Sequence, residues 1–359
     1  MQHKFHSNNF KYDFNDVMIV PTWTSLDSRA DANVTRDFWM PHAQKIIHCC
    51  PLIAANMSSV GTVAMSNVMT EKNCLTALHK YITPQEVNDS LTIRDNVFLT
   101  FGMEDIDIIK QKVKDCNYTD DNNLMICLDA ANGGMSKFNK QIYDVRKAFP
   151  NAVIMAGNIV TPDLVKTSIE AGADIVKVGI GSGSHCETRK VTGIGYPQLS
   201  ALLECVEAAN EQRGYLCSDG GCKTSGDVVK AFAAGAGFVM LGGMLAGHRE
   251  SITNEEMDEL LTYTDKECGV GNGVNLDEPY PFDVDVYGMS SNHALNKYHN
   301  GKKDYRASEG KLTKVPYRGT VAKTIKEIQG GIRSGLSYTN SRNLIEFYTN
   351  SKFVITGNI

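Results

Sequence analysis

The sequence predicts a (β/α)8 barrel, which is a closed parallel sheet surrounded by helices. Eight short apolar runs recur between residues 51 and 243, and stretches of helical periodicity separate them. Strands that are apolar throughout and alternate with helices indicate a parallel sheet covered on its outer face. Repeated βα units favour a closed barrel, although an open doubly wound sheet remains the alternative. We expect the strands at 51–57, 74–80, 96–102, 124–131, 152–159, 175–181, 214–221 and 238–243.

The segments between these strands carry the pattern of helices that pack on a sheet. We expect helices at 103–115, 137–149, 162–171 and 197–210, and the last two begin with proline, which suits the first turn of a helix. The segments 171–179 and 234–242 echo each other, because each has an Ala-Gly-Ala helix end, a strand and a closing glycine. Such repetition supports the barrel.

The whole chain, 1–359, reads as one catalytic domain. The barrel strands occupy about 51–243, an excursion covers 249–286, and C-terminal segments and helices cover 287–359. The excursion holds eleven acidic and two basic residues, so we expect it to be solvated and near the active-site mouth. Both a passive insertion and a functional lid are open interpretations.

Composition excludes several classes of function. The net charge is −5, and lysine and arginine are not clustered, so nothing indicates a nucleic acid or an acidic membrane as partner. No apolar run is long enough to cross a bilayer and the N-terminus lacks the apolar core of a signal peptide, so we expect a cytoplasmic protein. The ten cysteines are scattered without metal-ligand spacing, so most are expected to be reduced and buried.

Two glycine-rich loops follow the last two predicted strands. In a barrel, chemistry lies on loops at the C-terminal ends of the strands, and the last two loops often bind phosphate through converging backbone N–H groups. Ser218-Asp219-Gly220-Gly221 and Gly242-Gly243 occupy these positions, although glycines can also simply end strands. A carboxylate such as Asp219 can accept hydrogen bonds from ribose hydroxyls. Together the loops predict a nucleoside monophosphate site.

Cys186 is the candidate nucleophile. It lies in the glycine-rich loop 179–189, directly after the sixth strand, whereas an arbitrary cysteine is usually a buried structural residue. Nearby His185 and Arg189 could favour its thiolate. The spacing of Gly179-x-Gly-x-Gly183 differs from the dinucleotide fingerprint, so a cofactor would bind across the barrel mouth.

Several motifs carry a family resemblance. The loop core Cys186-x-Thr188-Arg189, followed by Thr-Gly-Ile-Gly-Tyr-Pro-Gln at 192–198, resembles the catalytic loop of the IMP dehydrogenase and GMP reductase family. The resemblance extends from about residue 13 to residue 353. Further matches lie at 54–57, 128–133, 156–161, 218–221, 239–247, 287–291 and 305–310.

Two features resemble the reductase branch of that family. Only residues 81–95 separate the second and third strands, which leaves no room for the regulatory domain that most IMP dehydrogenases insert there. Segments 306–310 and 330–334 also resemble the reductases. The resemblance implies NADPH-dependent reductive deamination of GMP to IMP and ammonia through a thioimidate on Cys186. Oxidation of IMP, or a nucleotide-binding regulatory protein that has lost turnover, are the alternatives.

The resemblance also implies a role for each matching residue. Thr188 and Glu309 would handle the proton that ammonia needs to leave, and potassium would be held by loop residues Gly181, Gly183, Cys186 and Arg189. The nucleotide would contact Ser218, Asp219, Gly220, Gly221, Gly242, Gly243, Tyr287, Gly288, Met289, Arg306, Ser308 and Gly310.

NADPH would be held by two subunits of a homotetramer. In one subunit it would contact Lys80, Asp129, Ala130, Ala131, Ile180, Gly181, Tyr305 and Arg306. A neighbouring subunit would complete the site with Ser28, Arg29, Ser334, Gly335, Leu336 and Ser337.

The catalytic loop departs from the family pattern at three positions. Ser182 replaces a proline, which raises the entropy cost of ordering the loop. His185 replaces an aliphatic residue and would favour the Cys186 thiolate if it were protonated, whereas Glu187 replaces a small polar residue and would oppose the thiolate. Two further departures from the family pattern are Ser58-Ser59, on the nucleotide side, and Gly335-Leu336, on the cofactor side.

Overall fold

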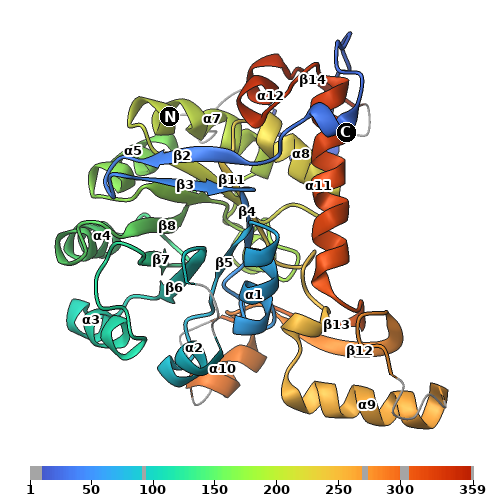
Figure 1. Ribbon diagram of the computed structural model, residues 1–359. Helices are drawn as coiled ribbons and strands as arrows, with labels where there is room; N and C mark the ends of the chain where they lie inside the picture. The colour runs from blue at the N-terminus through green and yellow to red at the C-terminus, as the bar shows by residue number, and fades with distance from the viewer. Residues whose placement is uncertain (1–9, 91–93, 269–273, 300–306, 357–359) are drawn as a thin grey trace.

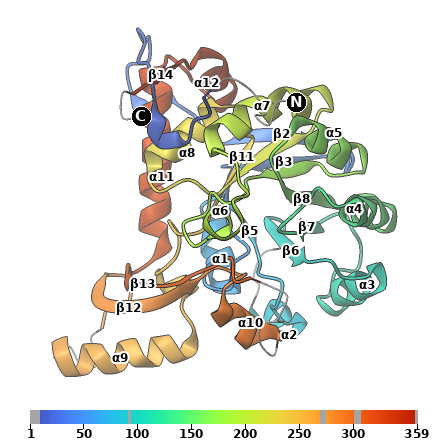
Figure 2. The same cartoon turned by 180° about the vertical axis from the view of Figure 1, so that it is seen from behind.

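A closed eight-stranded parallel barrel forms the core of the computed structural model, which describes residues 10–90, 94–268, 274–299 and 307–356 (Figures 1 and 2). Each barrel strand pairs with the next one along the chain, and the last closes onto the first. The prediction of a closed barrel is therefore confirmed. The strands are β4 (Leu52–Ala54), β5 (Leu75–Ala77), β6 (Val97–Phe101), β7 (Met125–Asp129), β8 (Val153–Ile159), β9 (Ile175–Val178), β10 (Tyr215–Asp219) and β11 (Phe238–Leu241).

Helices cover the outside of the barrel, and α11 takes the place of the eighth one because it packs against both α8 and α1. Threonine caps open α1, α8 and α11, where the side chains of Thr62, Thr224 and Thr320 accept backbone N–H groups of the first turn. The covering helices are α1 (Val63–Glu71), α2 (Pro84–Ser90), α3 (Ile106–Asp115), α4 (Ser136–Ala148), α5 (Pro162–Glu170), α7 (Gln198–Glu211), α8 (Ser225–Ala233) and α11 (Val321–Tyr338).

An N-terminal hairpin closes the end of the barrel opposite the catalytic loop. Strands β2 (Arg36–Met40) and β3 (Lys45–Cys49) pair antiparallel, and their inward side chains join the apolar residues of the barrel interior in one cluster. The ring of Phe38 stacks on that of Phe238 at 4.3 Å between centroids. The hairpin therefore seals the core, and the site is left at the other end.

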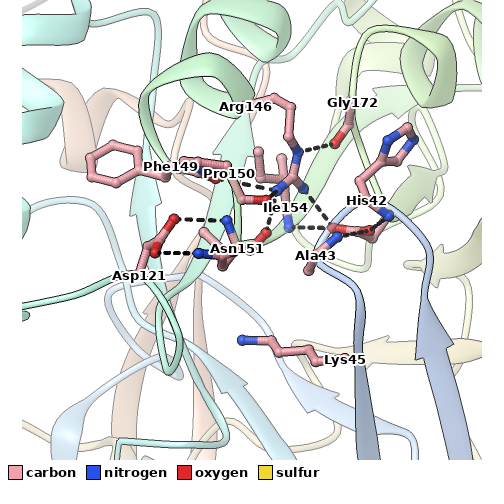
Figure 3. Close-up of polar contacts among 12 residues, drawn as sticks. His42, Ala43, Lys45, Asp121, Arg146, Phe149, Pro150, Asn151, Ile154 and Gly172 are labelled. Carbon is pink, nitrogen blue, oxygen red and sulfur yellow. Dashed lines mark hydrogen bonds and ion pairs between the residues drawn. The ribbon is translucent and has the colours of Figure 1, made fainter.

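A buried ion pair fastens this hairpin to the barrel (Figure 3). The carboxylate of Asp174 is fully buried and accepts hydrogen bonds from the amides of His42, Ala43 and Ile154, at 3.0, 3.3 and 3.0 Å. It also accepts one from Arg146 Nη2 at 2.8 Å. Arg146 donates further to four backbone carbonyls. Every charge in this network is paired, as a buried charge requires.

A C-terminal extension stands at the open end of the barrel, where β12 (Tyr280–Tyr287) pairs antiparallel with β13 (Leu312–Tyr317) (Figure 1). Strand β1 (Val17–Ile19) pairs with β14 (Phe353–Ile355). The remaining elements are short 3-10 helices η1 (Phe14–Asp16), η2 (Arg29–Asp31) and η3 (Arg249–Ser251), and helices α6 (Thr188–Thr192), α9 (Asn254–Cys268), α10 (Asn292–His299) and α12 (Leu344–Asn350).

The acidic excursion includes a helix that packs against β12. It contains α9, whose Leu260 and Thr264 are fully buried, and Glu256 accepts a hydrogen bond from the amide of Asp285 on β12 at 3.1 Å. The acidic composition of the segment predicts that it is solvated. Apolar positions on one face of α9 nevertheless give this helix a packing surface. Among the described helices, none has the length and apolar character needed to cross a membrane.

Candidate active site

Cys186 lies at the barrel mouth in the loop between β9 and α6. Seven of the nine described cysteines are buried, whereas Cys186 is partly exposed. Its thiol points at the Thr188 hydroxyl, with 3.2 Å from Sγ to Oγ1, and this hydroxyl donates to Glu309 Oε2 at 2.7 Å. The three side chains form a continuous hydrogen-bonded chain from thiol to carboxylate. Such a chain can carry a proton between a nucleophile and a leaving group.

Backbone pairing holds Glu309 in this position, although 121 residues separate it from Thr188. Cys186 and Gly310 form an antiparallel β-bridge, and the amide of Glu187 donates to the carbonyl of Glu309 at 2.7 Å. A β-carbon on Gly288 would lie 2.8 Å from the carbonyl oxygen of His185, so only glycine fits between these segments. The loop and the extension thus form one rigid wall.

The two glycine-rich loops approach the catalytic loop closely. Gly220 has a φ of +88°, and a β-carbon on it would lie 2.8 Å from the amide nitrogen of Gly183. A β-carbon on Gly243 would lie 2.5 Å from Ser184 Oγ. The backbones of these loops and the Ser184 hydroxyl therefore lie close together. Closely spaced glycine-rich loops at a barrel mouth are typical of phosphate sites.

Residues at the end of β12 and after β4 and β12 lie beside these loops. The amide of Ser58 approaches Met289 Sδ at 3.3 Å, and the ring of Tyr287 packs against His293 at 4.4 Å. A β-carbon on Gly242 would meet Met57 Sδ at 2.9 Å. The predicted base-contacting segment therefore lies next to the predicted phosphate loops.

A buried lysine connects the ends of three strands. Lys177 on β9 lies 2.5 Å from Asp129 Oδ1 and 3.5 Å from Asp219 Oδ2, measured from Nζ. Burial opposes its charge, but the carboxylate of Asp129 and then that of Asp219 outweigh this, so the pKa of Lys177 is raised. Burial likewise opposes the charge of Asp129, but the Lys177 ammonium keeps the pKa of that carboxyl below its usual value. Asn158 Nδ2 also donates to Asp219, at 2.8 Å.

Known proteins match this chain over nearly its whole length. A family model described as IMP dehydrogenase / GMP reductase domain matches residues 111–358. The chain is 42% identical over 349 residues to the GMP reductase of Vibrio vulnificus (strain YJ016), which covers 96% of this chain and 94% of that protein. The chain belongs to the IMP dehydrogenase / GMP reductase family. It is also 41% identical over 351 residues to the GMP reductase of Photobacterium profundum, with 96% and 95% covered, and 41% identical over 356 residues to GMP reductase 2 of Mus musculus, with 97% and 94% covered.

Some of the residues that the family resemblance assigns to the cofactor lie together at the barrel mouth. Asp129, Ala130 and Ala131 follow β7, and hydrogen bonds of 2.8 Å in both directions tie Ala130 to the cis-linked pair Gly157-Asn158. Lys80 follows β5, and Ile180 and Gly181 open the catalytic loop. Tyr305 and Arg306 lie outside the described residues. Ser308 does lie in the structure, with its hydroxyl 3.3 Å from the Gly310 carbonyl oxygen.

A second group lies away from Cys186. Ser28 and Arg29, at the start of η2, pack beside α11, whose C-terminal end carries residues 334–337 far from β13 (Figure 1). Next to these residues is a cavity of about 290 Å³, lined by Ile19, Pro21, Val229, Gly335, Tyr338 and Thr339. The side chain of Leu336 is fully buried. The residue as a whole is 0% exposed, so Leu336 offers no surface to a ligand in this chain.

The predicted cation ligands lie in the catalytic loop and at the start of α6. The amide of Cys186 donates to the carbonyl of Gly183 at 3.0 Å, which closes a turn over residues 183–186. The guanidinium of Arg189 pairs with Asp13 at 2.9 Å, and the stem of Arg189 lies against Gly181. Arg189 could therefore offer a cation only its carbonyl oxygen. In the described part of the chain, no group of three or more His, Cys, Asp or Glu side chains is arranged to hold a metal.

The three departures in the loop have structural consequences. The Ser182 hydroxyl donates to the carbonyl of Asp219 at 2.9 Å, so a hydrogen bond restrains the loop where the family has proline. Burial, together with nearby Lys311, lowers the pKa of His185, which disfavours the protonated form that would help the thiolate. The carboxylate of Glu187 lies 3.5 Å from the ammonium of Lys190, which partly offsets its charge.

Sequence reasoning missed three residues that build the site. Lys177 had a visible signal, because it is a charged residue inside an otherwise apolar strand. Ser184 lies within the loop that the sequence analysis identified, but its contact with Gly243 depends on the fold. Asp13 had no signal, since it is 176 residues from Arg189.

Proposed function

We propose that this chain catalyses the NADPH-dependent reductive deamination of GMP to IMP and ammonia. One observation carries the proposal: the hydrogen-bonded chain of Cys186, Thr188 and Glu309 borders the phosphate-binding space. This places a nucleophile and a proton carrier where the purine of a phosphate-anchored nucleotide would lie. Family membership supports the same chemistry.

The phosphate of GMP is bound by the loops that carry Gly220, Gly221, Gly242 and Gly243, with the Ser184 hydroxyl beside them. The amide of Gly221 donates to the Ser182 carbonyl at 3.0 Å, so the amides of the other three glycines are the donors in this proposal. The ribose hydroxyls donate to Asp219, and the base lies along Tyr287–Met289. Because both ends of the nucleotide are fixed, C2 of the purine is presented to Cys186. Positioning of this kind supplies a large part of a catalysed rate.

In the first step, the sulfur of Cys186 forms a bond to C2 and the bond from C2 to the 2-amino nitrogen breaks. The thiol proton passes through Thr188 and Glu309 to the departing nitrogen, which leaves as ammonia. A thioimidate remains on the enzyme. In the second step, C2 receives a hydride and the carbon–sulfur bond breaks, so that IMP leaves and the thiolate takes up a proton from solvent.

NADPH supplies that hydride when it is bound and becomes NADP+. The residues present fit such a group, since the Asp129 carboxylate at the mouth is partly exposed and is kept ionised by Lys177 beneath it. Such a carboxylate accepts hydrogen bonds from the amide or hydroxyl donors of a nicotinamide nucleotide. Lys80 offers a positive charge on the same side of the mouth.

Potassium would be held by carbonyls of Gly181, Gly183 and Cys186. The turn closed by the Gly183 carbonyl fits a hard cation that takes oxygen ligands. Its role would be to order the catalytic loop. Replacing potassium with tetramethylammonium should lower kcat by about tenfold or more with little change in the unfolding curve, and equal rates in both salts would exclude the cation.

A homotetramer would complete the cofactor site. In this proposal, Ser28, Arg29, Ser334 and Ser337 serve the site of a neighbouring subunit, and the packing of η2 against α11 supports their acting as one group. Light scattering should give about four times the mass of one chain. A monomer that retains full activity would exclude this arrangement.

The activity is tested by mixing GMP, NADPH and the protein in potassium buffer while the absorbance of reduced cofactor is followed. The expected result is one IMP and one ammonia formed for each NADPH consumed, with Cys186→Ala inactive. Cys217→Ala, at a fully buried cysteine of the barrel interior, is the matched control and should keep the reaction. No cofactor consumption by a folded protein that binds GMP would contradict the proposal.

A further inference from the structure

Lys177 is a charged residue in the interior of the barrel. It lies two positions after Ile175, whose side chain belongs to the interior cluster, and its own side chain is only 1% exposed. A β-carbon on neighbouring Gly157 would lie 2.6 Å from Lys177 Cβ, so the adjacent strand gives it space by lacking a side chain. A buried lysine normally loses its charge unless anions face it.

Two anions do face it, and they come from different strands. Asp129 ends β7 and Asp219 ends β10, at 2.5 Å and 3.5 Å from the ammonium nitrogen. Asp219 has a further donor in Asn158 Nδ2 at 2.8 Å, whereas the side chain of Asp129 is held chiefly by the ammonium. The Lys177 ammonium therefore interacts with Asp129, on the predicted cofactor side, and with Asp219, on the predicted ribose side.

We propose that Lys177 is a positioning residue that serves both binding sites at once, by fixing the two carboxylates that receive the ribose of the nucleotide and the nicotinamide nucleotide. This inference rests on the proposed function. One ammonium with three donors can hold both side chains in place, so that each keeps lone pairs available for a ligand at the barrel mouth. Without it, the two partly exposed carboxylates would lose the cation that lies between them and would repel each other, so their side chains would turn apart.

The test measures binding, not turnover. IMP and NADP+ are titrated separately by calorimetry into the wild-type protein, Lys177→Met and Lys177→Arg. We expect Lys177→Met to weaken both ligands by about tenfold or more, and Lys177→Arg to restore at least part of each loss because it keeps the charge. Lys230→Met is the matched control, because Lys230 is also largely buried near an aspartate, Asp227 at 3.8 Å, but lies on α8 outside the barrel. It should leave both affinities unchanged.

A second comparison keeps the test decisive if Lys177→Met does not fold. The double variant Asp129→Asn/Lys177→Met removes one charge of each sign, so it leaves the net charge of the cluster unaltered. It is compared with Asp129→Asn alone, and we expect IMP to bind about tenfold more weakly to the double variant. Equal IMP affinity in these two proteins would overturn the inference, as would loss of only one ligand in Lys177→Met.

The outcome is separable from that of the proposed function. Wild-type turnover of GMP together with unaltered affinities in the Lys177 variants would remove the inference and leave the function. Failure of the wild-type protein to bind either IMP or NADP+ would overturn both.

Discussion

Replacing Gly220 by alanine should disable the site while leaving the barrel folded. The added β-carbon would lie 2.8 Å from the amide nitrogen of Gly183 and 2.6 Å from Ser182 Oγ. The serine hydroxyl can rotate away, but the backbone of Gly183 cannot. The catalytic loop would therefore have to retreat from the phosphate-binding space.

The magnitude follows from these distances. Ordinary contacts begin near 3.4 Å, so the loop backbone must move by about 0.6 Å. A displacement of about 1 Å at a reacting group can cost about 100-fold in rate, so we expect kcat/KM to fall between about 10-fold and 100-fold. The φ of +88° adds strain for alanine of about 1–2 kcal/mol in the free energy of unfolding. That loss is small enough for a domain of this size to stay folded.

The assay combines NADPH consumption, IMP titration and urea unfolding. Gly330→Ala is the matched control, because a β-carbon there meets nothing within 4 Å and the residue lies inside α11. That variant should keep full activity and become slightly more stable, by up to about 1 kcal/mol. A Gly220→Ala protein with kcat/KM within threefold of wild type would refute the packing of the phosphate loops against the catalytic loop.

Three further outcomes follow from the contacts. Glu309→Gln removes the proton acceptor that lies 2.7 Å from Thr188 Oγ1, so kcat should fall by about 100-fold or more. The affinity for IMP, measured by titration, should stay within about threefold of wild type. A kcat near that of wild type would contradict the proton chain. His185→Val removes the ring whose Nδ1 lies 3.1 Å from Ser184 Oγ. In steady-state kinetics, KM for GMP should therefore rise by several-fold while kcat is little altered. An unchanged KM would show that Ser184 needs no such partner. Asp174→Asn leaves a buried guanidinium without its anion, so urea unfolding should show a loss of about 3–5 kcal/mol, and a loss under 1 kcal/mol would mean that the pair does not fasten the hairpin.

The barrel could be predicted because its strands leave a strong signal. They are buried on both faces, and glycine or polar residues lie at their ends or within the next two positions, so all eight overlap the predicted runs. The β2–β3 hairpin had no comparable signal. Each of its two strands has five residues, whose buried and exposed positions alternate. This alternation can be interpreted only when it is known that the hairpin covers the end of a barrel.

The site was predictable wherever its residues lie in one local motif. Cys186 and Thr188 belong to one local motif, and the structure shows the Cys186 thiol donating to the Thr188 hydroxyl. Glu309 came from family resemblance alone, because its position depends on backbone pairing between distant segments. The role of Lys177 could not be deduced locally either, since both carboxylates that face it belong to other strands.

The central claim is that the purine becomes covalently attached to Cys186. Its most direct measurement is to incubate the protein with GMP and NADP+, which cannot donate a hydride, quench the mixture and map nucleotide adducts by mass spectrometry. We expect an adduct on the peptide that carries Cys186, formed together with ammonia and absent from Cys186→Ala. Release of ammonia without any adduct on Cys186, or an adduct on another residue, would contradict the proposed chemistry.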